Sequence, residues 1–326
     1  MNFSQENRRA FLCECLSSVF VAGDTVKLDF IWPGPVPRGG QFFLIKPRRS
    51  EVFLGRPISV AGWKSRVPYV RNKDTERRTI MDRRLYSSRY SEAVPQQIID
   101  IRQNTDRRQN TGTILSFFVV RRGLGSRELT DLRPGEDAEL IGPLGNYWAK
   151  VDNQFSSQKA KNAGTVALVG GGVGIAPLLA YAKELENRPY DFYAGFRTGS
   201  YGVENIKPRS LIIATEDGSQ GPKGYITDFF TPSGYSMVFA CGPEPMLRVV
   251  GDACIASEIP CFISLERNMA CGVGACLGCT VRTTGERHPA GQEKHRAGEV
   301  RSSSGNRLCC TDGPIFNAEE VCFDIR

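Results

Sequence analysis

Three closely spaced cysteines near the C-terminal end constrain this chain more than any other feature. The segment ACGVGACLGC places Cys271, Cys276 and Cys279 at the C-x4-C-x2-C spacing of plant-type [2Fe–2S] ferredoxin loops. Its glycines let the backbone fold closely around a cluster and point amide N–H groups at the sulfur atoms. The fourth thiolate must come from a distant segment, where Cys309 and Cys310 are both candidates. A structural zinc site is the alternative, but zinc favours paired knuckles over one compact triple and a distant single ligand.

The composition is that of a globular protein whose cysteines bind metal. The chain has 326 residues, of which 40% are hydrophobic and 24% are charged, which is typical of two or three globular domains. Five of its eleven cysteines fall between residues 271 and 310, so we expect metal ligands in a reducing, cytoplasmic location rather than a secreted disulfide scaffold. The longest apolar run, 165–182, contains four glycines and a proline and predicts a strand, a turn and a helix rather than a membrane span.

The formal net charge of +7 is concentrated in one segment. Residues 64–110 contain twelve Lys or Arg and six Asp or Glu, which gives +6 and leaves +1 for the rest of the chain. A surface that binds a phosphate backbone carries positive charge along the whole binding face, whereas here the charge is confined to one segment. We therefore expect neither a nucleic-acid partner nor a membrane partner. The segment lacks a sustained apolar period and is interpreted as a long solvated insertion, with a basic docking surface as the alternative. The only two histidines, His288 and His295, argue against His-based triads and HExxH zinc sites.

Two patterns of hydrophobicity divide the chain into a mixed fold. Residues 10–62 alternate apolar and polar positions in short runs, and strand character resumes at 113–121, which is typical of an antiparallel β-barrel. From residue 165 onwards buried strands alternate with helices, which is typical of a parallel sheet. The expected strands there are 165–169, 190–196, 211–215 and 236–240, with helices at 175–187 and 243–251. The predicted units are a barrel domain over 1–150 that carries the insertion 64–110, a polar linker over 151–163, an α/β domain over 164–258 and a small [2Fe–2S] domain over 259–326.

A glycine-rich turn between a strand and a helix indicates a dinucleotide site. GGGVGIAP directly follows the expected strand 165–169, and glycines there let the backbone approach a pyrophosphate at the helix N-terminus. The segment is not a strict GxGxxG, and a merely tight turn is the alternative. ACGPEPML supports binding because it brings a cysteine to the rim where a nicotinamide would lie, although that cysteine could equally be a buried core residue. The candidate dinucleotide-binding residues are Gly170, Gly171, Gly172, Gly174, Cys241, Gly242 and Pro243.

Two short motifs ahead of this turn indicate a flavin site. In RPIS, Arg56 can hold a pyrophosphate bidentately and Ser59 can hydrogen-bond the edge of an isoalloxazine ring. In GLGS, Gly123, Gly125 and Ser126 can form a second turn that faces phosphate. Each motif is common alone, and their order ahead of the dinucleotide half is what gives them weight.

The order of the motifs resembles a known family. RPIS, GLGS, GPLGN, GGGVGIAP, EDGSQGPKGYITD, CGPEPML, ACGVGACLGC and CTDGPIFNAEEV together resemble the iron–sulfur electron-transfer subunit of the two-subunit, NAD-linked (class 1B) dihydroorotate dehydrogenase, within the ferredoxin–NAD(P)+ reductase superfamily. The resemblance covers nearly the whole chain outside 64–110 and 280–308. The cysteine motif and the DGPIF segment are its most specific parts.

The resemblance implies an oxidoreductase subunit of pyrimidine biosynthesis that carries electrons between NAD(H), FAD and a [2Fe–2S] cluster. It implies FAD, not FMN, in the barrel, lined by Arg56, Pro57, Ile58 and Ser59, and it makes Cys310 the fourth cluster ligand. It places NAD(H) at Gly170 to Pro177, Asp217, Gly218 and Cys241 to Pro243. It also implies a partner, an FMN-containing dihydroorotate dehydrogenase catalytic subunit, in a heterotetramer, with net electron flow from dihydroorotate to NAD+. No catalytic side chain is expected, because the cofactors carry the chemistry.

Three features depart from the family pattern. The insertion 64–110 is additional, thirty residues separate Cys279 from Cys310 where the family has a shorter loop, and Ser126 stands where Thr is usual. Arg197 in GFRTGS could touch an adenosine 2′-phosphate, so the residues alone leave NADP(H) open, whereas the resemblance favours NAD.

Two other functions are weighed against this interpretation. A reductase subunit of a sulfide dehydrogenase or of a glutamate-synthase-like complex would share the cofactor motifs and differ in its partner. A zinc-stapled nucleic-acid-binding protein would use the basic insertion and would be colourless.

Overall fold

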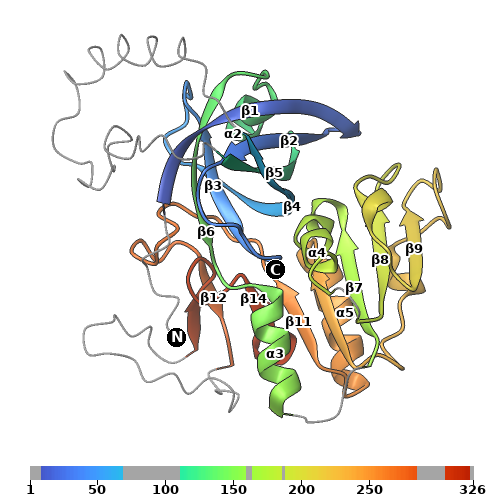
Figure 1. Cartoon of the computed structure of the whole chain (residues 1–326). Coiled ribbons are helices and arrows are strands. Elements are labelled where there is room, and N and C mark those ends of the chain that lie inside the picture. The colour runs from blue at the N-terminus through green and yellow to red at the C-terminus, as the bar shows by residue number, and fades with distance from the viewer. Residues whose placement is uncertain (1–8, 69–110, 159–163, 186–187, 285–304, 324–326) are drawn as a thin grey trace, which may run out of the picture.

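The computed structural model describes residues 9–68, 111–158, 164–185, 188–284 and 305–323. The N-terminal half forms a β-barrel and the C-terminal half forms an α/β sheet, and the two units lie one above the other in Figure 1. This arrangement confirms the predicted mixed fold class. Within the described ranges, no helix combines the length and the apolar character needed to cross a membrane.

The first unit is a closed antiparallel barrel with the strand order β1-β2-β5-β4-β3-β6. Its elements are β1 (Arg9–Ala22), β2 (Thr25–Trp32), β3 (Phe42–Pro47), β4 (Arg56–Pro68), β5 (Thr111–Val120), the short helix α2 (Leu124–Thr130) and β6 (Asp137–Leu144). Aromatic rings fill the interior, where Phe43 packs edge-on against Trp32 and Phe117, with ring centroids 4.9 and 5.6 Å apart. Because closure leaves no free strand edge, the barrel is a stable platform for the loops at its ends.

The predicted insertion 64–110 begins within β4, and its residues 69–110 lie outside the described structure. Pro68 and Thr111 are paired across β4 and β5, so the segment leaves and re-enters the barrel at adjacent positions. Replacing 69–110 with an Asn-Gly turn would close an ordinary hairpin. Each halving of the loop length lowers the entropic free-energy cost of closing the loop by only about 0.6 kcal/mol. We therefore expect the shortened protein to keep its flavin and its iron and to unfold at a temperature no lower than that of the full chain, measured by absorbance and calorimetry. Loss of flavin in this variant would show that the segment packs over the cofactor.

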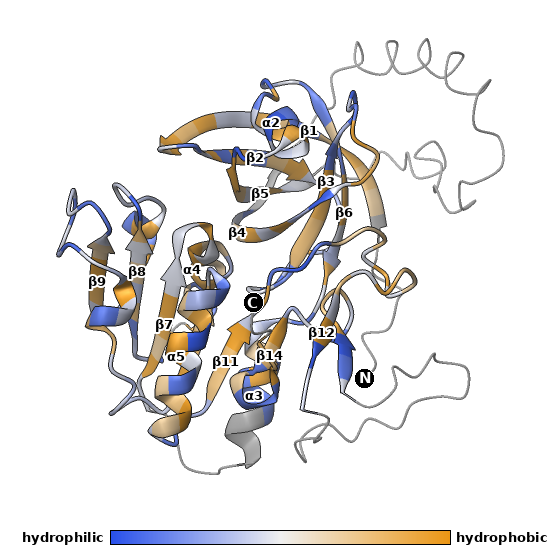
Figure 2. Ribbon diagram, turned by 180° about the vertical axis from the view of Figure 1, so that it is seen from behind, coloured by the Kyte–Doolittle hydropathy of each residue, from blue (hydrophilic) through white to orange (hydrophobic). Residues whose placement is uncertain are grey.

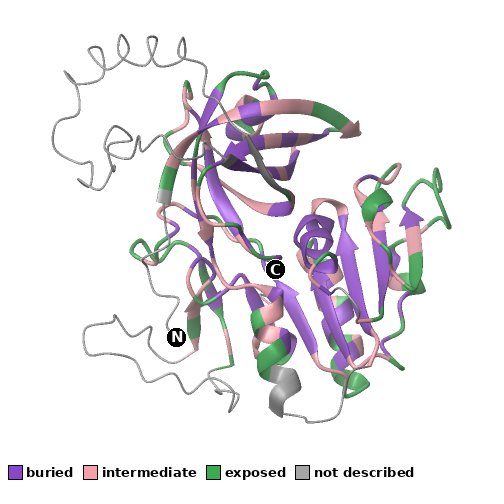
Figure 3. Cartoon of the chain, viewed as in Figure 1, coloured by how far each residue is buried: buried purple, intermediate pink, exposed green. Residues whose placement is uncertain are grey.

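The second unit is a six-stranded sheet with the order β14-β11-β10-β7-β8-β9. Its strands are β7 (Val166–Gly171), β8 (Tyr190–Phe196), β9 (Ser210–Thr215), β10 (Met237–Cys241), β11 (Cys261–Ser264) and β14 (Ile315–Asn317). All neighbouring strands are parallel except β11 and β14. Its helices are α4 (Ile175–Ala182) and α5 (Glu244–Ala256), with short 3-10 turns η2 (Gly172–Gly174), η3 (Val203–Asn205), η4 (Ile226–Phe229) and η6 (Ala318–Glu320). Every residue of α4 is buried (Figure 3), which explains its uniformly apolar sequence.

The C-terminal segment is shared between this sheet and the cysteine loop. Strands β11 and β14 complete the sheet, whereas β12 (Thr280–Arg282) and β13 (Asn306–Leu308) form a separate hairpin. Figure 2 shows apolar residues along β11 and β14, as expected of strands inside a covered sheet. The cysteine loop is therefore anchored to the sheet on both sides, by β11 before it and by β14 after it.

The prediction of a linker over 151–163 is wrong for residues 151–158, which belong to helix α3 (Trp148–Gln158). Residues 159–163 lie outside the described structure. Trp148 is fully buried and Asp152, one turn later, is 6% exposed. Tertiary contacts of this kind, rather than an amphipathic pattern, stabilise a short polar helix, and the sequence therefore carries little sign of it.

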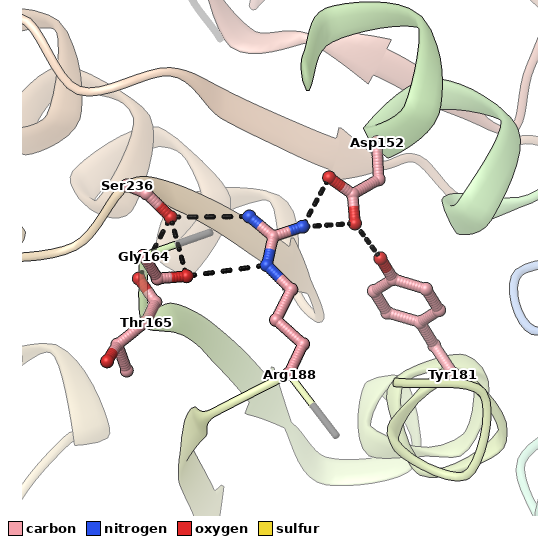
Figure 4. Close-up of polar contacts among 6 residues, drawn as sticks. All are labelled: Asp152, Gly164, Thr165, Tyr181, Arg188 and Ser236. Atoms are coloured by element: carbon pink, nitrogen blue, oxygen red, sulfur yellow. Dashed lines mark hydrogen bonds and ion pairs between the residues drawn. The ribbon is translucent and has the colours of Figure 1, made fainter. Parts of the chain in front are cut away.

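A partly buried ion pair fixes α3 to the sheet (Figure 4). The Arg188 guanidinium donates to both carboxylate oxygens of Asp152 at 2.5 and 2.6 Å, and the Tyr181 hydroxyl donates to the same carboxylate at 2.5 Å. Arg188 also donates to the Ser236 hydroxyl at 3.3 Å and to the Gly164 carbonyl at 3.4 Å. This network holds the connection between barrel and sheet in one orientation.

The carboxyl ends of the parallel strands face the barrel (Figure 1). Phe118 of β5 packs against Tyr201, which follows β8, with ring centroids 5.1 Å apart. A Cβ on Gly39 would lie 2.6 Å from the backbone of Tyr181, so the loop before β3 is pressed against α4. Ligands of open α/β sheets bind beyond the carboxyl ends of the strands, which places a candidate site between the two units.

Candidate functional site

The two motifs predicted to bind flavin meet in the structure. Arg56 begins β4, and a Cβ on Gly125 would lie only 2.2 Å from the Arg56 Nε. Glycine at position 125 therefore makes room for the guanidinium, which is half-buried beside α2 and suits a bidentate contact with phosphate. Pro57, Ile58 and Ser59 follow along β4, are half-buried and pair with β3.

Ser126 holds the second flavin motif together. Its hydroxyl accepts hydrogen bonds from the N–H groups of Arg122 and Gly123 at 2.9 and 3.0 Å, and it donates to the Gly123 carbonyl at 2.9 Å. The hydroxyl is thus used to shape the turn at Gly123, rather than pointing freely at a ligand. A threonine has the same hydroxyl and would make the same bonds, so the exchange preserves this turn.

The turns at Gly170–Gly174 and at Cys241–Pro243, both predicted to bind a dinucleotide, lie with their backbones in direct contact. A Cβ on Gly174 would lie 2.3 Å from the carbonyl oxygen of Cys241, and a Cβ on Gly242 would lie 3.0 Å from the backbone nitrogen of Gly171. A Cβ on Gly172, by contrast, would meet nothing within 4 Å, and Gly172 has a φ of +54°. The turn therefore opens into free space at Gly172, where a phosphate can approach the backbone closely.

Cys241 ends β10, opposite Gly170 of β7 and Ser264 of β11. The side chain is 3% exposed, and burial raises the pKa of its thiol well above the ordinary range. The thiol therefore stays neutral near pH 7 and is no nucleophile. The interpretation as a buried core residue is therefore confirmed, and a contact with nicotinamide stays a prediction for this residue at the carboxyl end of a strand. Pro243, two residues later, is the N-cap of α5.

Asp217 and Gly218 lie apart from these two turns, because they follow β9 at the far edge of the sheet. The Asp217 carboxylate accepts from the Ser219 hydroxyl at 2.7 Å and from the Ser219 N–H at 2.9 Å, which lowers the pKa of Asp217. The Ser219 hydroxyl also accepts from the N–H of Gly199 at 3.0 Å, which joins this loop to the one that carries Arg197. A single ligand contacts both regions only if it extends along the strand ends, as a dinucleotide does.

The four candidate cluster ligands lie as two pairs. The N–H of Cys276 donates to the Cys271 Sγ, and the N–H of Cys310 donates to the Cys279 Sγ, both at 3.4 Å. Backbone N–H groups, of Cys271 and Gly278 foremost, lower the pKa of the exposed Cys276 thiol to about 7. Burial and the neighbouring Cys279 thiol raise the pKa of Cys310 to about 12, and metal coordination would deprotonate it outright. A [2Fe–2S] cluster takes two thiolates on each iron, which this arrangement matches.

Cys309 and Cys310 point in different directions. Cys309 is fully buried, and its thiol donates to the Leu265 carbonyl at 3.2 Å. The charge of Cys279 reaches both thiols, but only Cys310 also shares a side-chain hydrogen bond with Cys279 and lies close enough to Cys271 for that charge to raise its pKa. In the described part of the chain, no three His, Cys, Asp or Glu side chains converge on a single ion position. These contacts support Cys310 as the fourth ligand.

Left-handed backbone conformations shape the cysteine loop. Gly272 and Gly274 have φ values of +66° and +83°. A Cβ on Gly272 would lie 2.7 Å from Leu44 of β3, and one on Gly274 would lie 3.1 Å from the Thr311 side chain. The loop is therefore pressed between the barrel and the segment that carries Cys310. Leu277 adopts a φ of +57° without being glycine, which costs roughly 1–3 kcal/mol.

Glu266 belongs to this region and was missed by the sequence analysis. It follows β11, is exposed to solvent and yet is surrounded by enough protein for burial to raise its pKa. The positive charge of Arg122, next to the second flavin motif, opposes this rise. The only sequence signal is a polar residue after the apolar run CFISL, which does not reveal the influence of an arginine so distant in the sequence.

Comparison with known proteins identifies relatives of the whole chain. Residues 266–322 match the family model of the iron–sulfur cluster binding domain of dihydroorotate dehydrogenase B. The chain is 39% identical over 209 residues to the dihydroorotate dehydrogenase B (NAD(+)) electron transfer subunit of Clostridium acetobutylicum, covering 64% of this chain and 74% of the relative. It is 36% identical to the Clostridium perfringens subunit, covering 87% of each chain. It is 30% identical to that of Caldanaerobacter subterraneus, covering 94% of this chain and 96% of the relative.

Solved structures show a similar fold. The chain superposes on a structure of an NADH-dependent reduced ferredoxin-NADP oxidoreductase with a TM-score of 0.64 at 24% identity, covering 96% of this chain and 90% of the other. It also resembles the Amycolatopsis cytochrome P450 reductase GcoB, with a TM-score of 0.51 at 19% identity over 76% of this chain and 66% of the other. At these identities the likeness concerns the fold alone, a barrel followed by an α/β sheet.

Proposed function

Because the chain belongs to the family of dihydroorotate dehydrogenase B electron-transfer subunits, we propose that it carries electrons between NAD(H) and a dihydroorotate-oxidising catalytic subunit. FAD, NAD(H) and a [2Fe–2S] cluster are the cofactors of this transfer. When bound, the flavin exchanges a hydride with nicotinamide and single electrons with the cluster. The described side chains position these groups, and none is needed as a catalytic acid or base within the dehydrogenation of dihydroorotate.

The proposed cofactor-binding residues follow the contacts in the structure. Arg56 holds the flavin pyrophosphate beside Gly125, with Pro57, Ile58 and Ser59 along the ring. Gly172 gives the dinucleotide phosphates access to the backbone, between the packed turns of Gly174 and Cys241. The observation that carries the proposal is the double pair of thiols, Cys271 with Cys276 and Cys279 with Cys310, in a loop that packs on the barrel.

The partner follows from family membership. The names of the relatives describe one subunit of a larger enzyme, so this chain works with a catalytic subunit. We propose that this subunit contains FMN, that two copies of each form a heterotetramer, and that the complex is cytoplasmic. NAD is the proposed coenzyme. Substitution of Arg197, which could contact an adenosine 2′-phosphate, would test whether the protein prefers NAD over NADP.

A reconstituted assay tests the proposal. The isolated chain is expected to reduce an artificial acceptor with NADH and to leave dihydroorotate untouched. Mixed with the FMN-containing catalytic subunit, it is expected to couple orotate formation to NAD+ reduction. If the two proteins bind and the coupled assay stays silent while sulfide or another donor supports NAD+ reduction, the chain serves a related reductase complex instead.

A further inference from the structure

The cysteine loop meets the proposed flavin strand across β3. Leu44 of β3 pairs with Pro57 of β4, one of the proposed flavin-binding residues. A Cβ on Gly272 in the cysteine loop would lie 2.7 Å from the Leu44 side chain and 3.1 Å from the side chain of Leu144, which ends β6. Leu44 is buried, so it links the cysteine loop to the strand that carries the flavin motif.

The proposed electron flow crosses this junction, because it runs between the flavin and the cluster. The rate of electron tunnelling falls steeply with the distance between two cofactors, so a small displacement of the loop changes the rate. Apolar packing such as that of Leu44 on Gly272 is non-directional, whereas hydrogen bonds constrain both distance and angle. A fixed separation therefore calls for polar contacts between the barrel and the cluster segment.

Asn146 makes these contacts from the end of the barrel. It follows β6 by two residues and belongs to GPLGN, a motif to which the proposed cofactor contacts assign no role. Its Nδ2 donates to the carbonyls of Asp312 at 3.1 Å and of Ile315 at 2.9 Å, and its Oδ1 accepts from the Ile315 N–H at 3.0 Å. Its backbone N–H donates to the Gly313 carbonyl at 2.7 Å. One half-buried residue of the barrel unit thus holds the segment 312–315.

The segment held by Asn146 is tied directly to the proposed fourth ligand. The Asp312 carboxylate accepts from the Leu308 N–H at 2.7 Å. The Leu308 carbonyl in turn accepts from the N–H groups of Asp312 at 2.8 Å and of Gly313 at 3.2 Å. Cys310 lies within this closed turn, so a contact that holds Asp312 also holds Cys310.

Gly145 makes the joint tight on both sides. It has a φ of +78°, and a Cβ there would lie 2.6 Å from the Pro314 side chain and 3.0 Å from the Gly313 carbonyl oxygen. Its own carbonyl accepts from the Gln41 side chain, in the loop before β3, at 3.2 Å. Gly145 and Asn146 therefore contact both the start of the flavin-bearing strands and the segment that follows the cluster ligands.

We propose that Asn146 is a positioning residue that holds the cluster at the distance from the flavin at which electrons pass rapidly between them. It acts through the backbone of 312–315 and is not itself a ligand. Electrons move in either direction with no bond formed or broken at Asn146. The inference rests on the proposed function and deepens it by naming the contact that sets the rate of electron transfer inside the chain.

The substitution Asn146→Asp tests this role, because it keeps the size of the side chain and replaces Nδ2 with a carboxylate oxygen. That oxygen faces the carbonyls of Asp312 and Ile315, so two attractive contacts become repulsive. Laser-flash photoreduction of the flavin in the FAD-loaded, cluster-containing protein measures internal transfer apart from the hydride step. We expect electron transfer from flavin to cluster to slow about tenfold, which corresponds to about 1.4 kcal/mol, and the rate of flavin reduction by NADH to stay unchanged. Asn205→Asp, the same change at an exposed position of η3, should behave as the wild type.

Hydrogen exchange gives a readout that does not depend on electron transfer. In Asn146→Ala the Ile315 N–H loses its acceptor, so exchange within 312–317 should become faster, while β2 keeps the protection of the wild type. This variant should also slow transfer from flavin to cluster. Flavin content, iron content and the reduction potential of the cluster should match the wild type in both Asn146 variants.

Three results would overturn the proposal. The first is a wild-type rate of transfer from flavin to cluster in both Asn146 variants. The second is a cluster potential shifted far enough to account for a slower rate. The third is loss of iron from both variants, because Asn146 would then be needed to build the cluster site rather than to position it. A wild-type protein that binds no FAD, or whose flavin NADH does not reduce, would instead overturn the proposed function.

Discussion

Cys279→Ser is expected to remove the cluster and leave FAD in place. Cys279 is 2% exposed, and its Sγ accepts from the N–H of Cys310 at 3.4 Å. A serine there removes one thiolate ligand at a buried position. The proposed flavin contacts start at Arg56, on another unit. Iron and sulfide analysis should therefore fall from two of each per chain towards none, while flavin fluorescence after denaturation stays unchanged.

Matched cysteine variants separate ligation from simple loss of packing. Cys310→Ser should lose iron as Cys279→Ser does. Cys309→Ser should retain it, because the Cys309 thiol is turned to the Leu265 carbonyl, and Cys254→Ser, a buried change in α5, should also retain it. Iron lost from Cys309→Ser and kept in Cys310→Ser would reverse the assignment of the fourth ligand.

Leu277→Glu is expected to block electron transfer to the partner. Leu277 and Val273 are apolar, 52% and 43% exposed, and flank the exposed Cys276 in the cysteine loop. Exposed apolar residues around an electron exit suit a docking surface. A central interface residue is typically worth 2–4 kcal/mol, which corresponds to a loss of about 30- to 1000-fold in partner affinity. The coupled dihydroorotate assay at limiting partner should fall accordingly, with the NADH-to-dye rate unchanged.

Val249→Glu is the control for this change. Val249 is 51% exposed on α5, so the substitution adds the same charge to an equally exposed apolar residue away from the cysteine loop. Both variants should keep their iron and flavin. Equal coupling in Leu277→Glu and Val249→Glu would place the docking surface elsewhere on the chain.

Local patterns predicted the fold class well and long-range contacts poorly. Short alternating runs predicted the barrel, and the alternation of buried strands with helices from residue 165 onwards predicted the α/β unit, because both patterns depend on residues close in sequence. Helix α3 was missed because its buried residues, Trp148 and Asp152, are recognised only by their partners. The choice between Cys309 and Cys310 also depends on side-chain direction, which spacing does not reveal.

The candidate site shows the same division. The motifs identified the residue types that bind phosphate and iron, and the contact of Arg56 with Gly125 and of Gly174 with Cys241 then followed from the fold. The place of Asp217 at the edge strand, away from Cys241, depends on strand order, which no motif encodes.

The FAD and iron content of the purified chain, together with its absorbance during an anaerobic titration with NADH, tests the central claim most directly. The account predicts one FAD and two irons per chain, with flavin bands and a broad cluster absorbance that both bleach as NADH is added, because electrons pass from nicotinamide through the flavin to the cluster. Stoichiometric zinc without flavin, or flavin and iron that NADH does not reduce, would contradict it.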